Sequence, residues 1–555
     1  MEMFCYQCEE ATGGTGCTVR GVCGKSPEVA ALQDLVIHLL KGMSIYATRA
    51  RALGLSDDAG EELTARGLFA TITNVSFDPE QLQALGQEIL GHRDALRQQV
   101  EEAQGGPVSE DLPEAATWTP QSDSLDAWIG YGAQVGILAN DNLSDDQRSL
   151  RELLIYGVKG MAAYYDHARV LDESDPEIVA FMQSALEIAA EDNPDADELL
   201  GMVLAAGEMG VRTMALLDKA NTGAYGNPEP TQVNLGVKEG PAILVSGHDL
   251  RDLHELLEQT QGTGINIYTH GEMLPANAYP ALKKYDHLVG NYGGSWWHQG
   301  REFNSFNGAI LMTTNCLTPP RASYLDRLFT TSIVAWPGAT HIPDRVDGQP
   351  KDFGPVIAKA LECKSPTQIE EGSITIGFAH ETVLGVADKV IEAIQAGDIK
   401  RFVVMAGCDG RFASREYFTD VAQQLPEDSV ILTAGCAKYR YNKLDLGDIG
   451  GIPRLLDAGQ CNDSYSLVVV ALKLAEALGI DDVNELPIEY DIAWYEQKAV
   501  IVLLALLSLG VKRIRLGPAL PAFLSPGVAQ VIVDKFDLRP ITTAEQDLAS
   551  IVAGS

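Results

Sequence analysis

Apolar residues recur at helical spacing from about residue 27 to residue 225. Over this stretch Ala, Leu, Glu and Gln are frequent and β-branched runs are few, which favours helices. After about residue 226 the pattern changes to short β-rich runs, each ending in a glycine-containing turn and followed by a helical segment. That alternation is typical of α/β domains with parallel sheets. The sequence therefore predicts a helical N-terminal part and an α/β C-terminal part.

The helical part contains an internal repeat. The segment LQDLVIHLLKGMSIYATRARAL begins at Leu32, and LRELLIYGVKGMAAYYDHARVL begins 118 residues later at Leu150. The repeat predicts two related helix bundles packed together, joined by a surface connection over 107–124. The Met and Tyr residues that the two segments share are interpreted as core residues, namely Met43, Met161, Tyr46 and Tyr164.

Five of the apolar runs after residue 226 end on residue types that bind metals. These residues are His248 in PAILVSGH, Glu272 in INIYTHGE, Cys316 in AILMTTNC, Cys408 in RFVVMAGC and Cys436 in SVILTAGC. Each residue alone is explained as a buried thiol or a capping group. Because the carboxyl ends of parallel strands meet at one crevice, the five together predict a shared site, which Cys461 and Glu496 downstream would join.

The chemistry of this donor set is mixed. Thiolates suit iron and sulfide, whereas carboxylates suit harder iron bridged by oxygen. The set thus indicates a cluster of iron, sulfur and oxygen. Carboxylate ligands exchange readily, so such a cluster is able to open a position to substrate.

Four more cysteines, Cys5, Cys8, Cys17 and Cys23, lie within nineteen residues of a glycine-rich segment near the N-terminus. A disulfide knot fits poorly, because a chain of 555 residues, 46% of them hydrophobic, can bury several cores and shows no cationic, cleavable leader before Cys5. We therefore expect a cytoplasmic protein. An iron–sulfur cluster is favoured over a zinc site or free thiols, and all three remain open at this point.

Charge narrows the possible partners. The chain has 41 basic and 77 acidic residues, a net charge of −36, which repels nucleic acid and anionic lipid. The longest strongly apolar run, 499–510, is too short to cross a bilayer, which takes about 20 residues, and is predicted to be a buried element. No nucleic-acid or membrane partner is expected, whereas a small basic redox protein would suit this surface.

Long motifs then resemble those of the hybrid-cluster protein family, also called prismane proteins or hydroxylamine reductases. They are the Cx2Cx8Cx5C opening and the segments SGHDL, THGEMLPAN, TTNC, MAGCDGR, TAGCAKYRYN, DAGQCNDSYS and DIAWYEQKA, which together span nearly the whole chain. The resemblance implies a [4Fe-4S] cluster on Cys5, Cys8, Cys17 and Cys23. It also implies a hybrid [4Fe-2S-2O] cluster, with a persulfide on Cys408, held by His248, Glu272, Cys316, Cys408, Cys436, Cys461 and Glu496.

The resemblance implies an enzyme that reduces hydroxylamine to ammonia and water, with electrons relayed from a donor protein through the N-terminal cluster. The expected catalytic residues are Glu272 and Glu496 at the substrate position, with Lys498 and His270 as proton donors. An ion pair for Lys498 and a loop hydrogen bond for His270 are equally open. The alternatives are nitric oxide reduction or transfer of nitrosyl groups to protein thiols in nitrosative stress, and a redox enzyme like carbon monoxide dehydrogenase.

The expected domains follow from the pattern and the resemblance together. Residues 1–225 form a helical domain that carries the N-terminal cluster. Residues 226–364 and 365–555 form two Rossmann-like α/β domains with central parallel-type sheets, and the hybrid cluster lies at the domain interface.

Overall fold

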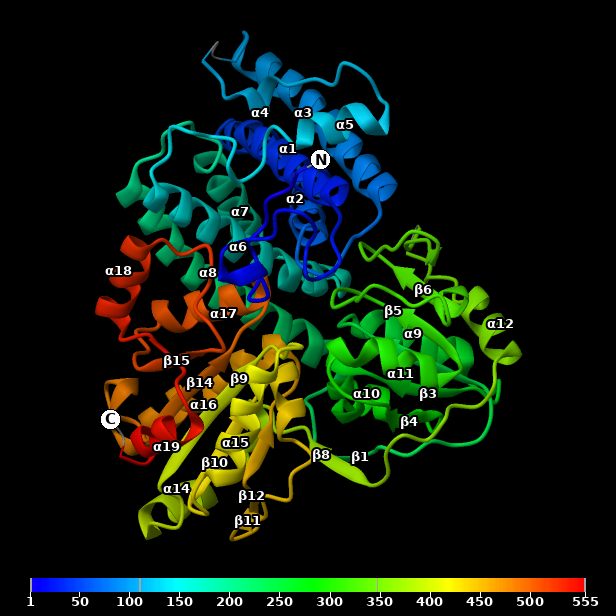
Figure 1. Ribbon diagram of the computed structural model, residues 1–555, viewed down its shortest axis with the longest axis vertical. Coiled ribbons are helices and arrows are strands. Elements are labelled where there is room, and N and C mark those ends of the chain that lie inside the picture. The colour runs from blue at the N-terminus through cyan, green and yellow to red at the C-terminus, as the bar shows by residue number, and fades with distance from the viewer. Residues whose placement is uncertain (1, 109–110, 347, 554–555) are drawn as a thin grey trace.

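The computed structural model describes residues 2–108, 111–346 and 348–553. Figure 1 shows helices, coloured blue to teal, above two α/β regions, of which the green one and the yellow-to-red one each surround a six-stranded sheet. The predicted helical N-terminal part and parallel-sheet C-terminal part are both present. The boundaries at 225 and 364 stay a prediction, although the last long helix of the first part ends at Tyr225.

The helical region consists of two triplets of helices. The first triplet is α1, α2 and α3, and the second is α6, α7 and α8. Ser26 and Ser144, at equivalent positions of the repeat, cap α1 and α6 by accepting a hydrogen bond from a backbone N–H of the first turn. The bounds are α1 Pro27–Ala52, α2 Asp58–Ala70, α3 Pro79–Gln104, α6 Asp145–Val170, α7 Pro176–Ile188 and α8 Ala196–Tyr225.

The triplets pack into each other, since α2 lies against α6 and α7 lies against α1. All four shared Met and Tyr side chains are buried. The predicted surface connection 107–124 is only partly correct. It contains α4 (Glu114–Thr117), which buries Ala115 and Ala116 against α1, and Ser109 and Glu110 lie outside the described residues. The helix α5 (Leu125–Gly132) follows it.

Glycines at equivalent positions of the repeat let another segment cross each long helix. A Cβ on Gly42 of α1 would lie 1.9 Å from the Ala115 carbonyl oxygen of α4. A Cβ on Gly160 of α6 would lie 2.2 Å from the Gln497 carbonyl oxygen, at the start of α17 (Gln497–Ser508). The helix α17 is the predicted buried apolar run, and it packs against α6 and α8.

One described helix, α8, is long and apolar enough to cross a membrane by length and composition. Of its most apolar window, 39% is buried. It packs against α6 and α17.

The first α/β region has a parallel sheet with strand order β4-β3-β2-β5-β6-β7. Short helices connect the strands, and the sheet core is closed by apolar residues of β2, β3, β5 and α9. The bounds are β2 Ala242–Ser246, β3 Asn266–Thr269, β4 Leu288–Asn291, β5 Ala309–Met312, β6 Leu328–Thr331, β7 Thr340–Ile342, α9 Leu250–Thr260, α10 Pro280–Lys283, α11 Gln299–Phe306 and α12 Gly354–Glu362.

The second region repeats this topology with the order β13-β10-β9-β14-β15-β16, again parallel. In both sheets the earliest strand lies in the middle, which is the doubly wound order of Rossmann-type folds. The bounds are β9 Arg401–Gly407, β10 Ser429–Thr433, β13 Leu455–Asp457, β14 Ile488–Ala493, β15 Ile514–Gly517, β16 Arg539–Pro540, α13 His380–Leu384, α14 Ala387–Ala396, α15 Glu416–Gln424, α16 Ser464–Leu478, α18 Pro526–Phe536 and α19 Ala544–Ala553.

Two small antiparallel ribbons complete the fold. The strands β1 (Thr231–Asn234) and β8 (Ser373–Ile376) pair where the chain enters and leaves the first α/β region. The strands β11 (Asp448–Ile449) and β12 (Ile452–Pro453) form a hairpin in the second region. In each large sheet the chain reverses its winding at the central strands, and ligands bind at the carboxyl ends of such strands.

Candidate metal centre

All seven predicted hybrid-cluster donors follow the carboxyl ends of sheet strands. Three come from the first sheet, after β2, β3 and β5, and four come from the second, after β9, β10, β13 and β14. The strands β13 and β14, which precede Cys461 and Glu496, were not predicted as strands. The donors are His248, Glu272, Cys316, Cys408, Cys436, Cys461 and Glu496, all buried or half-buried.

Contacts between the two sheets show that these ends face each other. The Cys461 amide donates to Glu272 Oε2 at 2.8 Å, and Cys461 Sγ lies 3.8 Å from His248 Nε2. Ligand atoms of His248, Glu272 and Cys461 all lie within 4.8 Å of one another. The side chain of Gln460 joins the same turns, because its Nε2 donates to the carbonyl oxygens of His248 and Glu272.

The other thiols belong to one buried cluster of side chains. Cys316, Cys408 and Cys436 lie there with the rings of Trp296 and Tyr495. The backbone of Cys316 has φ +71°, a left-handed conformation that costs a non-glycine residue roughly 1–3 kcal/mol. Such strain is typical of functional sites.

A glycine brings the turns after β9 and β14 together. Gly407 has φ +110°, and a Cβ there would lie 1.9 Å from the Ala493 carbonyl oxygen at the end of β14. That approach allows the Cys408 amide to donate to Ala493 O at 2.8 Å. Cys408 and Glu496 are thereby held on neighbouring turns of the second sheet.

Lys498 lies at the centre of the site. Its Nζ is 2.8 Å from His248 Nε2, donates to Asn315 Oδ1 at 3.0 Å, and lies 3.8 Å from Glu496 Oε1. Glu496 is the N-cap of α17, and its Oε2 accepts from the Lys498 amide at 2.9 Å. One helix start therefore positions both a carboxylate and an ammonium group toward the donors of the first sheet.

His270 is held differently. Its ring is fully buried, with Nδ1 3.0 Å from Ser246 Oγ and Nε2 3.0 Å from Glu302 Oε2. Burial alone would raise the pKa of Glu302, but the hydrogen bond and charge of His270 lower it to about 2. Both ring nitrogens are thus engaged, one by the end of β2 and the other by α11, as the hydrogen-bond alternative expects. A proton-donor role for His270 stays a prediction.

Burial in this site disfavours the charged forms of its thiols and of its imidazole. Burial raises the pKa values of Cys316 and Cys436 well above their usual range, and raises that of Cys461 to about 12. Burial, reinforced by the charge of Lys498, lowers the pKa of His248 well below its usual value, which leaves a neutral imidazole. A bound cation would reverse the state of the thiols, because coordination deprotonates them, whereas the neutral imidazole is already in the form that binds a metal.

One carboxylate oxygen of the site also lacks a hydrogen-bond partner among the described residues. Glu272 Oε1 is buried and accepts no hydrogen bond from the described residues. Buried carboxylate oxygens are normally satisfied. Four sulfurs, one imidazole and two carboxylates, one of them with an unused oxygen, fit an iron–sulfur–oxygen group.

The N-terminal cysteines form a second group. Cys5 and Cys17 exchange backbone hydrogen bonds of 3.1 and 2.8 Å, which closes the loop around them. Lys25 Nζ donates to Cys5 Sγ at 3.6 Å, and Cys8, Cys17 and Cys23 are buried. Burial, followed by the charges of neighbouring cysteines, raises the pKa of Cys8. All nine cysteines of the chain, including Cys363, are free thiols, so this loop offers four sulfurs to a cluster.

Arg415 links the two groups of cysteines. Its guanidinium is fully buried, donates to Glu9 Oε2 at 2.8 Å, and also donates to the carbonyl oxygens of Cys408 and Trp494. The Glu9 amide in turn donates to Tyr495 O at 2.9 Å. Cys8 lies in the same side-chain cluster as Cys436. The N-terminal loop is therefore attached directly to the turns that carry Cys408 and Glu496.

Several residues of the site were missed from the sequence. Asn315 and Gln460 each precede a donor cysteine in the motifs TTNC and DAGQC, and that adjacency was the available signal. Tyr164 and His167 reach the site from α6, where the ring of His167 stacks on the ring of His248 with centroids 6.0 Å apart. Their helical spacing gave no sign of this, because buried core residues show the same pattern.

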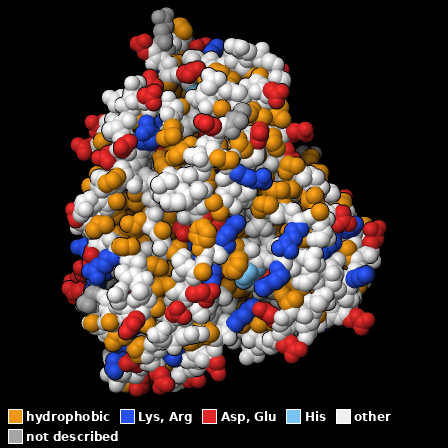
Figure 2. All heavy atoms as spheres, viewed as in Figure 1, with side chains coloured by type: hydrophobic (Ala, Val, Ile, Leu, Met, Phe, Trp, Pro, Cys, Tyr) orange, Lys and Arg blue, Asp and Glu red, His pale blue; other side chains and the backbone are white. Residues whose placement is uncertain are grey.

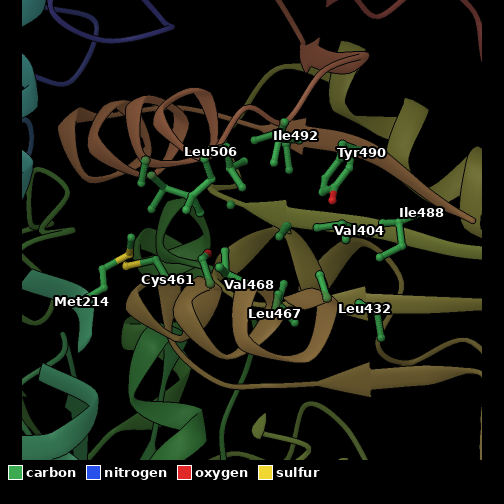
Figure 3. A pocket seen from close by; sticks show the side chains of 18 of the residues that line it. Met214, Val404, Leu432, Cys461, Leu467, Val468, Ile488, Tyr490, Ile492 and Leu506 are labelled. Atoms are coloured by element: carbon green, nitrogen blue, oxygen red, sulfur yellow. The ribbon is translucent and has the colours of Figure 1, made fainter. Parts of the chain in front are cut away.

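An apolar cavity of about 50 Å³ adjoins the site. Figure 3 shows Met214 and Cys461 at one end of it and Ile488 and Tyr490 at the other. Cys408 also lines the cavity, together with apolar side chains of β9, β14, α16 and α17. It is suited to a small molecule without charge.

A larger, polar cavity of about 360 Å³ lies in the helical region beside Cys5. Its wall includes Asp34 and Lys41 of α1 and, at the equivalent repeat positions, Glu152 and Lys159 of α6. On the molecular surface, Figure 2 shows Asp and Glu side chains spread around the margin of one face, as the net charge of −36 predicts.

Comparisons with known proteins agree along the whole chain. Residues 3–549 match the family model described as Prismane/CO dehydrogenase family. Proteins named hydroxylamine reductase from Halothermothrix orenii and Nitratidesulfovibrio vulgaris are each 60% identical, with 100% of both chains covered.

Among solved structures, carbon monoxide dehydrogenase IV from Carboxydothermus hydrogenoformans has a TM-score of 0.58 at 17% identity, covering 97% of this chain and 89% of that one. A nickel-free carbon monoxide dehydrogenase from Thermococcus sp. AM4 has a TM-score of 0.57 at 18% identity, covering 99% and 91%. At these identities the likeness shows a shared fold.

Proposed function

The chain belongs to the Prismane/CO dehydrogenase family, and from that premise we propose that it is a hydroxylamine reductase. The reaction takes hydroxylamine, two electrons and two protons to ammonia and water, and the bond that breaks is N–O. The observation that carries the proposal is that ligand atoms of His248, Glu272 and Cys461, which follow strands of two different parallel sheets, lie within 4.8 Å of one another, with the other four proposed donors at neighbouring strand ends. The name shared by relatives at 60% identity supports it independently.

His248, Glu272, Cys316, Cys408, Cys436, Cys461 and Glu496 would hold the hybrid cluster, with an added sulfur on Cys408. When bound, this group supplies redox-active iron that serves as a Lewis acid for the substrate and as a source of electrons. Glu272 is the ligand best suited to yield its place, because only one of its oxygens is held by a hydrogen bond.

Lys498 is the residue best placed to deliver a proton. Desolvation lowers the pKa of the Lys498 ammonium group, but the negative charges of Cys461, as a ligating thiolate, and of Glu496 would outweigh desolvation and raise it, so that the group carries its proton. If His248 holds the metal, Asn315 and Glu496 would remain to orient Lys498 Nζ. The leaving oxygen must receive a proton for water to form, and an ammonium group held in place provides one.

Cys5, Cys8, Cys17 and Cys23 would hold a [4Fe-4S] cluster that passes electrons inward. The contacts of Glu9 with Arg415 and Tyr495 support this direction, because they join the N-terminal loop to the hybrid-cluster turns. The electron donor would be a redox protein that docks near this loop.

Reduction of nitric oxide is a second candidate, supported by the apolar cavity that ends at Cys408 and Cys461. A small uncharged molecule crosses such a cavity more easily than a polar one. Transfer of nitrosyl groups to protein thiols would use the same binding. A role like that of carbon monoxide dehydrogenase rests on fold alone and would require nickel.

The test is an anaerobic assay of the reduced protein with hydroxylamine and nitric oxide in parallel, with product identification and metal analysis. We expect ammonia from hydroxylamine at a ratio of one to one, with iron and no stoichiometric nickel. Failure to form ammonia while nitric oxide is consumed would replace the first candidate by the second. Nickel at cluster stoichiometry would favour carbon monoxide chemistry.

A further inference from the structure

The internal repeat places the same residue type, tyrosine, in two different surroundings. Tyr46 of α1 and Tyr164 of α6 occupy equivalent positions, each four residues after the glycine at which another segment crosses the helix. Tyr46 donates its hydroxyl hydrogen to the Ala116 carbonyl oxygen of α4 at 3.1 Å. In the second repeat, the segment that crosses at Gly160 is the start of α17, which carries Glu496 and Lys498.

The hydroxyl of Tyr164 has no such carbonyl acceptor among the described residues. Its side chain is buried, and within the described ranges 2–108, 111–346 and 348–553 no atom meets its oxygen at normal hydrogen-bond distance, although it interacts with the Cys461 thiol. It lies beside the Cys461 thiol, with Glu496 and Cys408 also near. A buried hydroxyl is normally satisfied, so one that lacks a partner at normal hydrogen-bond distance next to three proposed ligands calls for an explanation.

A second polar side chain, on the next turn of α6, also lies against the candidate site. His167 lies three residues beyond Tyr164 and thus on the same face of the helix. Its ring stacks on the ring of His248, and its Nε2 is a buried atom for which no described residue serves as a partner. The helical region therefore forms one wall of the candidate metal centre, with two polar groups that have no partner at hydrogen-bond distance among the described residues.

We propose that Tyr164 is a positioning residue that donates a hydrogen bond from its hydroxyl to the Cys461 thiolate when the metal centre is assembled. A thiol is a weak acceptor, whereas a thiolate accepts a charge-assisted hydrogen bond. The contact between the Tyr164 hydroxyl and the Cys461 sulfur would therefore strengthen when that sulfur is a ligand. Hydrogen bonds to ligand sulfurs raise the reduction potential of iron–sulfur centres, because they stabilise the more negative reduced state.

The inference rests on the proposed function only through the presence of the metal centre. It assigns to the second repeat a role in tuning the potential of that centre. The equivalent residue of the first repeat, Tyr46, would have a structural role alone, in attaching α4 to α1.

The test compares Tyr164→Phe with Tyr46→Phe in the iron-loaded protein. For each variant the iron content, the midpoint potential and EPR signal of the hybrid centre, the thermal midpoint and the rate of hydroxylamine reduction are measured. Phenylalanine fills the same space, so both variants are expected to fold and bind iron. The potential and the EPR signal are measured without substrate.

For Tyr164→Phe we expect a lower midpoint potential, an altered EPR signal, a turnover reduced about tenfold, and an unchanged thermal midpoint. For Tyr46→Phe we expect the parent potential and EPR signal, and a thermal midpoint lowered by about 2 °C through loss of a buried hydrogen bond. A parent-like potential and EPR signal in Tyr164→Phe would overturn the proposal, as would equal shifts in both variants.

Failure of the proposed function gives a different result. A parent protein that contains the iron centre but forms no ammonia would contradict hydroxylamine reduction. The shift in potential for Tyr164→Phe would still occur in that case, because it depends on the thiolate ligand and not on the substrate.

Discussion

The two carboxylate oxygens of Glu272 have different surroundings. One oxygen is held by the Cys461 amide, and Oε1 is free of protein partners among the residues that the structure describes. A carboxylate moves between bound and unbound states by small rotations. We predict that Glu272→Gln still assembles the cluster, with turnover reduced about a hundredfold, because a charged ligand at the substrate position is lost.

Cys461→Ala is the informative comparison. It removes a sulfur that lies 3.8 Å from His248 Nε2 and within 4.8 Å of a Glu272 oxygen, and should reduce assembly itself. Iron per chain, EPR and hydroxylamine turnover distinguish the two variants. Glu272→Gln with the parent rate and normal iron would show that this carboxylate does not guard the open position.

The sequence was sufficient to predict which residues lie at the strand ends of the candidate site, but not the groups that surround them. His248, Cys408 and Cys436 follow apolar runs directly, so their positions at strand ends were visible. Tyr164 was interpreted as a core residue, because the equivalent residue of the first repeat, Tyr46, shows the same sequence pattern. Its different role arises from what crosses the helix, which depends on a segment more than 300 residues away.

At the scale of elements, the crossing of α6 and α17 determines where Glu496 and Lys498 lie. A Cβ on Gly160 would come within 2.2 Å of Gln497 O. We predict that Gly160→Ala lowers the free energy of unfolding by about 1–3 kcal/mol and reduces iron content and turnover, because α17 must shift.

The control is Gly201→Ala in α8, where an added Cβ meets nothing within 4 Å. Alanine is the better helix former, so this variant should be neutral or gain up to about 1 kcal/mol. Urea unfolding and iron analysis on both variants check the prediction. Equal effects of the two substitutions would show that the crossing does not position the site.

Helix α9 is held in place by a buried carboxylate, and this interaction predicts that the stability of the protein depends on pH. Asp252 accepts from Lys351 Nζ at 3.1 Å and from Arg345 Nη2 at 2.7 Å. Desolvation raises the pKa of Asp252, but Lys351 and Arg345 outweigh it and lower the pKa below its usual value. A lowered folded-state pKa contributes stability that is present above the unfolded value of about 3.9 and is lost as the pH falls.

We therefore predict that Asp252→Asn costs about 3 kcal/mol of unfolding free energy at pH 7, and that its difference from the parent shrinks below about pH 4. Asp428→Asn, at a surface pair with Lys400 and Arg401, should cost less than about 1 kcal/mol. Urea titrations from pH 7 down to pH 3.5 measure both. A difference for Asp252→Asn that stays constant with pH would contradict the assignment.

On the scale of the whole molecule, the site exists only where three regions meet. The helical region contributes Tyr164 and His167, and the two sheets contribute the seven proposed donors. The sequence predicted each region from its own periodicity, since that property is local. It gave no access to the contacts between regions, such as Arg415 with Glu9, because they join segments more than 400 residues apart.

The N-terminal loop should be separable in function from the strand-end site. We predict that Cys8→Ser loses the spectroscopic signature of the [4Fe-4S] cluster and retains the hybrid cluster, because a hydroxyl is a poor replacement for thiolate and the other donors come from different regions. Electron delivery should slow sharply. Iron analysis and EPR check this, and retention of full iron content would mean that these cysteines do not hold a cluster.

The most direct test of the central claim is anomalous diffraction from anaerobically grown crystals, recorded on both sides of the iron absorption edge. We predict two separate groups of iron atoms. One should lie among Cys5, Cys8, Cys17 and Cys23, and the other should lie among the seven strand-end donors, within bonding distance of Cys461 and His248. Absence of iron between the two sheets, with the N-terminal group present, would contradict the account.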